Sequence, residues 1–259
     1  MSGFDSYNFS TSPTAKVNEP DRSGRDVSWH RFLRATSVAA AAAGAPPSIN
    51  YAGMVANAAS IKTLSELIQA GIPVLYRSHI YHAISKHHDP LPEPYNTYSE
   101  APLSPSINAE ITKDLDRTFP THKDNHSDTL AEILHAYANL HPDIGYCQGL
   151  GLLTFPLTVL STTASSSLQI LHRFTHIFGP NFFDHTCLGR YGDMLAFNHL
   201  VRAVHPTLFA ALENQGVDVG LATADWFATG FAGKFRDMEF CFRIWDIVLY
   251  EGHVAFLWR

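Results

Sequence analysis

The strongest constraint on this chain is the helical spacing of its apolar residues, which recurs in segments separated by glycine and proline. In one segment Ile61, Leu64 and Ile68 share a helical face until Gly71, and Pro73 starts the next segment. A later stretch, HSDTLAEILHAYANLHPD, spaces its apolar residues in the same way. No segment shows the sustained apolar–polar alternation of a half-buried strand. We therefore predict an all-α fold built from many helices.

Length and composition narrow the possible functions. The 259 residues suffice for one large domain or two small ones, and 46% hydrophobic residues supply a sizeable core. A net charge of −6 gives no reason to expect a polyanionic partner, so we do not expect nucleic-acid binding. The longest apolar run, residues 150–160, is shorter than the roughly 18 residues that a transmembrane segment needs, so we expect none.

Composition also divides the chain into three parts. Residues 1–26 are polar and aperiodic, without the basic and apolar regions of a signal peptide, and we expect a disordered tail. Residues 27–60 begin with Trp29, Phe32 and Leu33 at helical spacing and continue into an alanine-rich stretch. We expect a short helix there, followed by a linker or insertion. Residues 61–259 are expected to form the helical domain.

Cysteine and histidine give no sign of a metal site. Cys147, Cys187 and Cys241 are odd in number, widely separated and surrounded by residues that we expect in the core, so neither a disulfide framework nor a zinc site is predicted. His172 and His176 stand four residues apart but lack an acidic or cysteine third ligand, which favours structural roles. We expect no bound metal and a reducing, cytoplasmic setting.

The segment EITKDLDRTFP, residues 110–120, combines an ion pair with a helix end. Proline disfavours helical geometry in the residue before it, so the helix should end near Thr118 and leave Arg117 in its last turn. Asp114 precedes Arg117 by three residues and lies on the same face, where its carboxylate can orient the guanidinium. The pair is either an ordinary solvated ion pair or a positioned functional arginine.

Two further stretches hold unusual polar residues. In HPDIGYCQGLG, Gln148 stands near a helix start with glycines on both sides, which let another backbone approach closely. Gln148 is either a functional amide or a buried side chain that bonds to the turn. In CFRIWDIVLYEG, Arg243 and Asp246 stand three residues apart beside a buried face, and we interpret them as an intrahelical pair that orients the helix.

Together these fragments resemble a known family. GIPVLYRSHIY, EITKDLDRTFP, GYCQG, and WFATGF followed by RIWDIVLYEG occur in the order and approximate spacing of the TBC domain. That domain is the all-helical GTPase-activating domain for Rab GTPases. Each fragment is weak alone, but four in order over about 200 residues are hard to obtain by chance. The resemblance covers residues 61–259.

The resemblance implies roles for particular residues. Arg117 matches the catalytic arginine finger of the family's I-x-x-D-x-x-R motif, and Gln148 matches the glutamine finger of its Y-x-Q motif. The remaining motif positions, which support the fingers or the partner interface, are Ile111, Asp114, Tyr146, Arg243 and Asp246.

The activity implied by the resemblance is that of an activator rather than an enzyme in its own right. The chain would accelerate GTP hydrolysis by a GTP-bound Rab GTPase and would need no cofactor of its own, because GTP and Mg²⁺ are carried by the partner. Such an activity belongs to vesicle trafficking, on a cytoplasmic protein that is recruited to endomembranes by peripheral association.

Several departures from the family pattern keep an alternative open, namely a catalytically silent scaffold of the same fold that binds a GTPase or another partner. GKFRDMEF stands where the family has a leucine–proline pair, and STTASSSLQ lacks the expected acidic residue. The sequence also ends at HVAFLWR, before the C-terminal helices that the family leads us to expect, so we expect the domain to lack them.

Overall fold

The computed structural model describes residues 24–36, 49–118, 125–161, 163–179, 181–232 and 238–258. Within these ranges every regular element is an α-helix, which confirms the predicted all-α fold. Most of the expected disordered tail and the alanine-rich residues 37–48 lie outside the described ranges. Among the described helices, none combines the length and the apolar character needed to cross a membrane.

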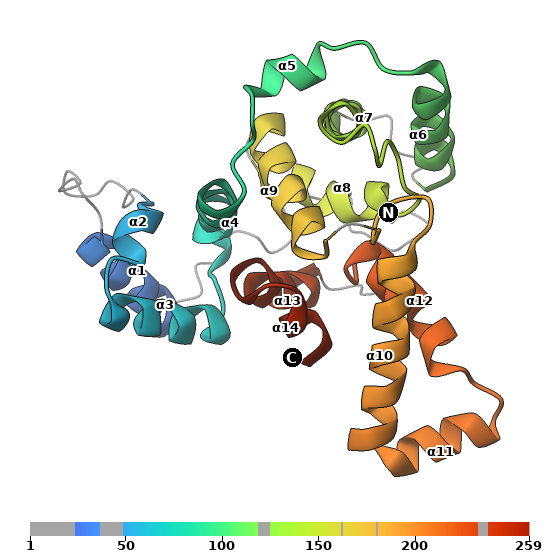
Figure 1. The fold of residues 1–259 in the computed structure, drawn as a ribbon. Helices are drawn as coiled ribbons and strands as arrows, with labels where there is room; N and C mark the ends of the chain where they lie inside the picture. Colours follow the sequence, from blue (N-terminus) through green and yellow to red (C-terminus); the bar gives the residue numbers. More distant parts are fainter. Residues whose placement is uncertain are drawn as a thin grey trace, which may run out of the picture.

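The first four helices gather beside one another, with α1, α2 and α3 at the left of Figure 1. α1 lies where a short helix was expected, and its Trp29 is fully buried. Part of the expected linker is also ordered, because Tyr51 and Met54 on α2 are buried and α2 packs against α4. The helices are α1 (Gly24–Thr36), α2 (Tyr51–Met54), α3 (Ala58–Ala70) and α4 (Val74–His88).

The middle of the chain forms a second group of packed helices. α9 packs along α4, and α7 packs against α5, α8 and α9. The apolar face predicted for the segment before residue 141 is buried here, including Leu130, Ile133 and Leu134. The helices are α5 (Tyr95–Ser99), α6 (Pro105–Thr118), α7 (Asn125–Leu140), α8 (Leu150–Leu160) and α9 (Ala164–Ile177).

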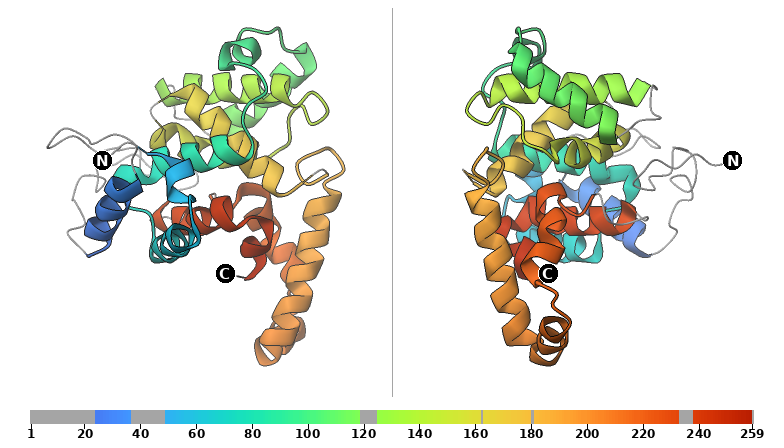
Figure 2. Two further views of the ribbon diagram at one scale, coloured as in Figure 1. Left: turned by 60° about the vertical axis from the view of Figure 1, so that its left-hand side comes forward. Right: turned by 90° about the vertical axis from the view of Figure 1, so that its right-hand side faces the viewer.

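The last five helices divide between a projecting arm and the core. α10 runs beside α12 and extends away from the body of the molecule with α11 at its far end (Figure 2). α13 returns to the centre and packs against α3, α4 and α9. These helices are α10 (Leu188–Val204), α11 (Pro206–Asn214), α12 (Val219–Thr229), α13 (Met238–Glu251) and α14 (His253–Trp258).

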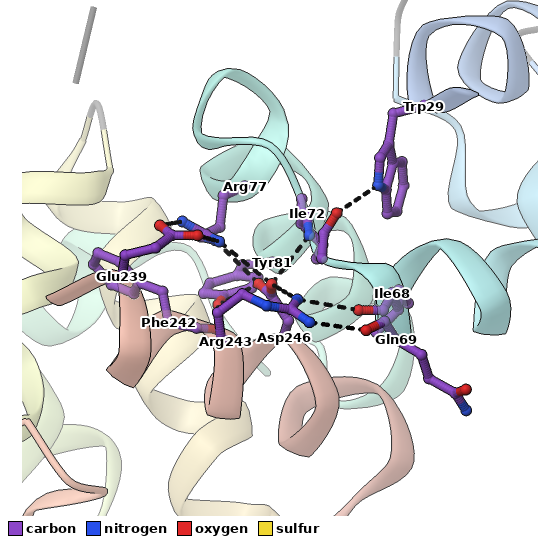
Figure 3. A network of polar contacts seen from close by, with 11 residues as sticks. Trp29, Ile68, Gln69, Ile72, Arg77, Tyr81, Glu239, Phe242, Arg243 and Asp246 are labelled. Carbon is purple, nitrogen blue, oxygen red and sulfur yellow. Dashed lines mark hydrogen bonds and ion pairs between the residues drawn. The ribbon is translucent and has the colours of Figure 1, made fainter. Parts of the chain in front are cut away.

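A buried carboxylate joins α3, α4 and α13. The side chain of Asp246, on α13, is completely buried. Arg77 Nε and the Tyr81 hydroxyl, both on α4, donate to Asp246 Oδ1 over 3.0 Å and 2.8 Å (Figure 3). The backbone N–H of Ile72 donates to Oδ2 over 3.0 Å. A buried charge is tolerated only when it is paired and hydrogen-bonded, and these donors meet that requirement.

The guanidinium at the centre of this network has a second acidic partner. Arg77 is fully buried, and its two terminal nitrogens donate to the Glu239 carboxylate over 2.7 Å and 2.8 Å. Burial lowers the pKa of Arg77, but Glu239, Tyr81 and Asp246 together raise it above its ordinary value. Arg77 therefore stays positively charged, and it lies between Glu239 at the beginning of α13 and Asp246 in the middle of that helix.

Arg243 connects the same carboxylate to the end of α3. Its guanidinium pairs with Asp246 at 2.9 Å and donates to the Gln69 carbonyl oxygen over 2.8 Å. The first contact confirms the intrahelical pair predicted from sequence, and the second places a cation at a helix C-terminus, where it is favourable. Gly71 permits this approach: its φ is +113°, and a Cβ there would lie 2.5 Å from Arg243 Nη1.

Removing the Asp246 carboxylate should lower the free energy of unfolding. Asp246→Ala leaves Arg77 buried without its central partner, and breaking a buried ion pair in this way costs about 3–5 kcal/mol of unfolding free energy. Urea denaturation measures the loss. Lys62→Ala is the control, because the Lys62–Glu66 pair is 3.8 Å apart on exposed side chains and should contribute under about 0.5 kcal/mol. Equal effects of the two substitutions would contradict the assigned role of Asp246.

Candidate functional site

The end of α6 carries the first candidate motif. α6 ends at Thr118, as the following proline predicts. Ile111 and Asp114 are buried, with 3% and 8% of their surface exposed. Both face the interior, whereas Arg117 occupies the last helical turn. The side chain of Arg117 lies outside the described part of the structure, so its ion pair with Asp114 stays a prediction.

The loop between α7 and α8, residues 141–149, carries the second motif. Gln148 is exposed, which contradicts the alternative of a buried glutamine bonded to the turn. Gly149 serves as the N-cap of α8, which begins at Leu150, close to the helix start predicted from sequence. The carboxamide of Gln148 is therefore presented to solvent immediately before a helix N-terminus. We call residues 141–149 the glutamine loop.

A hydrogen bond ties the glutamine loop to α6. The hydroxyl of Tyr146 donates to Asp114 Oδ2 over 2.6 Å. Burial, and after it the bond to Asp114, raise the pKa of this hydroxyl above its ordinary value, so the group remains a proton donor at neutral pH. The motif tyrosine and the motif aspartate thus hold together the two segments that carry Gln148 and Arg117.

Glycine allows the neighbouring helices to come close to this loop. Gly149 has a φ of +103°, and a Cβ there would lie 3.0 Å from the carbonyl oxygen of Ala228 on α12. A Cβ on Gly151 would lie 3.4 Å from Leu115 of α6 and 3.5 Å from the Tyr146 hydroxyl. A larger residue at Gly149 would therefore strain the backbone and push α12 away.

The end of α12 is itself fixed by the core. Gly230 caps α12 in a left-handed conformation, and its carbonyl oxygen accepts a hydrogen bond from the Trp245 indole over 2.7 Å. Trp245 is buried one residue before Asp246. The third motif therefore acts on the glutamine loop indirectly, through α12. Its two charged residues, Arg243 and Asp246, lie at the α3–α4 junction and not beside Gln148.

Sequence reasoning missed three members of the buried network and the bond between two motifs. Arg77 bonds to Glu239 and Tyr81 bonds to Asp246, each across more than 160 residues of sequence, and no local pattern pairs them. One signal was available, since an arginine among the apolar residues of GIPVLYRSHIY indicates a buried, paired charge. The Tyr146–Asp114 bond spans 32 residues and has no signal in the spacing of either motif.

The histidines considered as metal ligands have protein partners. His172 shares a hydrogen bond of 3.0 Å with His141, and His176 pairs with Asp89. Burial, followed by the nearby His172, lowers the pKa of His141 to about 4, so this ring is neutral at physiological pH. Across the described ranges, no group of three or more histidine, cysteine or acidic residues is arranged to hold a metal ion.

Comparison with known proteins identifies a family that matches most of the chain. The model of the Rab-GTPase-TBC domain matches residues 60–259. TBC1 domain family member 2B of Mus musculus is 32% identical over 204 residues, 73% of this chain and 21% of that protein. Growth hormone-regulated TBC protein 1 of Homo sapiens is 26% identical over 201 residues, 74% of this chain and 60% of that protein.

A solved structure has the same fold. The Chlamydomonas flagellar RabGAP TBC domain superposes with a TM-score of 0.69 at 18% sequence identity, over 98% of this chain and 84% of that one. The described chain thus corresponds to most of that domain, whereas it spans only about a fifth to three fifths of the two curated relatives.

The bond between the motifs predicts a measurable contribution to stability. Tyr146→Phe removes one donor from the buried Asp114 carboxylate, which should lower the unfolding free energy by about 1–3 kcal/mol. Tyr191→Phe is the matched control, because Tyr191 is 57% exposed and the change should have little effect. Urea denaturation of both variants checks this, and a Tyr146→Phe protein as stable as the control would show that the bond does not hold the loop.

Proposed function

The chain belongs to the Rab-GTPase-TBC domain family, and from this premise we propose that it accelerates GTP hydrolysis by a Rab-family small GTPase. In this proposal Arg117 is the arginine finger and Gln148 the glutamine finger, both supplied in trans. The protein is then an activator, and the GTPase carries the nucleotide, the Mg²⁺ and the bond that is cleaved.

The observation that carries the proposal is the bond between the two finger segments. Tyr146 stands two residues before Gln148, Asp114 stands three residues before Arg117, and the two side chains are 2.6 Å apart. A direct link of this kind sets the separation of the fingers before a partner binds. Catalytic groups that are already in place need no reorganisation at the moment of reaction. Preorganised sites accelerate reactions for this reason.

Arginine suits the first role for electrostatic reasons. Negative charge spreads over the γ-phosphate oxygens as the bond to the leaving group breaks, and a cation placed there lowers the barrier. Arginine remains charged at all physiological pH values and offers a planar fork of donors that matches phosphate oxygens. In this proposal the guanidinium is supplied to the partner from the last turn of α6, which carries Arg117.

Glutamine suits the second role because its amide both accepts and donates hydrogen bonds. The carbonyl oxygen can accept from the attacking water while the NH₂ group donates to the partner. Gln148 is exposed and sits between the hydrogen-bonded Tyr146 and the sterically confined Gly149. The side chain is thus free to enter a partner's active site on a backbone that is fixed on both sides.

We further propose that this activity takes place on a cytoplasmic protein that associates peripherally with endomembranes and serves vesicle trafficking. The sequence keeps both finger residues, and the Tyr146–Asp114 bond links their two segments, which favours activity over a silent scaffold. A scaffold of the same fold would bind a GTP-loaded Rab without changing its hydrolysis rate, and that difference is measurable.

Removing either finger should abolish acceleration. An arginine supplied in trans is worth roughly 10³ to 10⁵ in rate, so Arg117→Ala should return single-turnover GTP hydrolysis close to the Rab's own rate. Arg117→Lys should rescue little, because an ammonium lacks the forked donors of a guanidinium. Gln148→Ala should also lose most of the acceleration. The assay uses a panel of GTP-loaded Rabs, after circular dichroism has shown that each variant is folded.

The matched controls remove the same residue types from exposed positions elsewhere. Arg31→Ala changes α1 and Gln215→Ala changes the end of α11, and both should leave the hydrolysis rate unaltered. Unchanged hydrolysis with Arg117→Ala, or binding without acceleration by the unaltered protein, would overturn the proposal, and the latter result would establish the scaffold.

A further inference from the structure

Two of the three cysteines lie together in the folded protein although 40 positions separate them in sequence. Cys147 belongs to the glutamine loop, and Cys187 immediately precedes α10. Arg190 Nη2 donates to the Cys187 sulfur and lies 4.0 Å from the Cys147 sulfur. One guanidinium nitrogen therefore brings both sulfurs into the same cluster.

The two thiols differ in a way that suits sequential oxidation. Cys147 is buried, and burial raises the pKa of its thiol to about 11, so the sulfur is protonated and protected at neutral pH. Cys187 is only half-buried, and its sulfur contacts the Arg190 guanidinium directly. Oxidants react with the cysteines that solvent can reach, so Cys187 is the thiol that meets the oxidant first.

We propose that Cys147 and Cys187 form a reversible disulfide that switches off the glutamine loop, with a peroxide as the oxidant. Cys187 attacks the peroxide O–O bond, giving a sulfenic acid and one water. Cys147 then attacks the Cys187 sulfur and gives its thiol proton to the departing hydroxide, so that the S–S bond forms and a second water leaves. The two sulfurs lose two electrons to the peroxide oxygens, and the two thiol protons leave in the waters. A small-molecule dithiol reverses the reaction by thiol–disulfide exchange.

The effect on activity rests on the proposed function and follows from the position of Cys147. This residue directly precedes Gln148, and its thiol lies 3.7 Å from the Gln148 carbonyl oxygen. A disulfide places the two sulfurs about 2.05 Å apart, closer than any contact between separate thiols. The Tyr146–Asp114 bond and the confinement of Gly149 hold the loop on both sides of this position. The displacement therefore falls on Gln148.

A catalytic amide tolerates little displacement. Productive geometry is held within about 0.5 Å, and a shift of about 1 Å can reduce a rate by about 10²-fold. Oxidation should accordingly reduce acceleration of GTP hydrolysis by about tenfold or more. The fold should remain intact, because the buried network around Asp246 contains no cysteine.

The test first asks whether the bond forms, independently of any GTPase. The chain is treated with hydrogen peroxide, alkylated, and digested with trypsin without reduction. A disulfide joins the tryptic peptide of residues 124–173 to that of residues 174–190, whereas Cys241 lies on the peptide of residues 237–243. We expect the 124–173/174–190 pair before treatment with dithiothreitol and not after it. Failure of this pair to form, or cross-linking to the Cys241 peptide instead, would overturn the proposal.

The second readout is stimulated GTP hydrolysis by the reduced and oxidised protein. Peroxide should lower it about tenfold or more and dithiothreitol should restore it. Cys187→Ser should resist peroxide, while Cys241→Ala, the matched control on α13, should remain sensitive. Sensitivity that persists in Cys187→Ser, or a disulfide without any loss of rate, would overturn the switch. If the disulfide forms on oxidation but the reduced protein activates no Rab, the proposed function is refuted and the modification site stands.

Discussion

The buried carboxylate of Asp246 is the interaction on which the rest of the structure depends. It holds Arg77 and Tyr81 of α4, the Ile72 amide of the α3–α4 turn and Arg243 of its own helix. Three helices that are distant in sequence therefore share one charged centre from which water is excluded. Such a centre is costly unless every partner is in place, so it favours a single arrangement of α3, α4 and α13 over alternative packings.

The packing of α3, α4 and α13 affects the candidate site through contacts between side chains and backbone rather than through charge. Trp245, next to Asp246, holds the end of α12 by its bond to the Gly230 carbonyl oxygen. The last turn of α12 then confines Gly149, which in turn places Gln148 at the start of α8. The third motif, whose Arg243–Asp246 pair we interpreted from sequence as structural, thus supports the site from a distance. Gln148, the exposed residue that we propose as the glutamine finger, lies at the end of this chain of contacts.

Much of this could be predicted from the sequence because it depends on local rules. Helical spacing predicted the all-α fold, and Pro120 predicted the end of α6 at Thr118. The three-residue spacing of Arg243 and Asp246 predicted their ion pair. In contrast, α2 lies where a linker was expected, because the burial of Tyr51 and Met54 against α4 outweighs the poor helical pattern around them.

What the sequence determined by itself was therefore the helices, their ends, and the family whose motifs occur in order along the chain. Only the tertiary structure decided which residues meet: Arg77 with Glu239, Tyr146 with Asp114, and Cys147 with Cys187. The physical reason is the range of the interactions. Backbone conformation responds to neighbours within a few residues, whereas hydrogen bonds and thiol contacts depend on distances that exist only after the helices have packed.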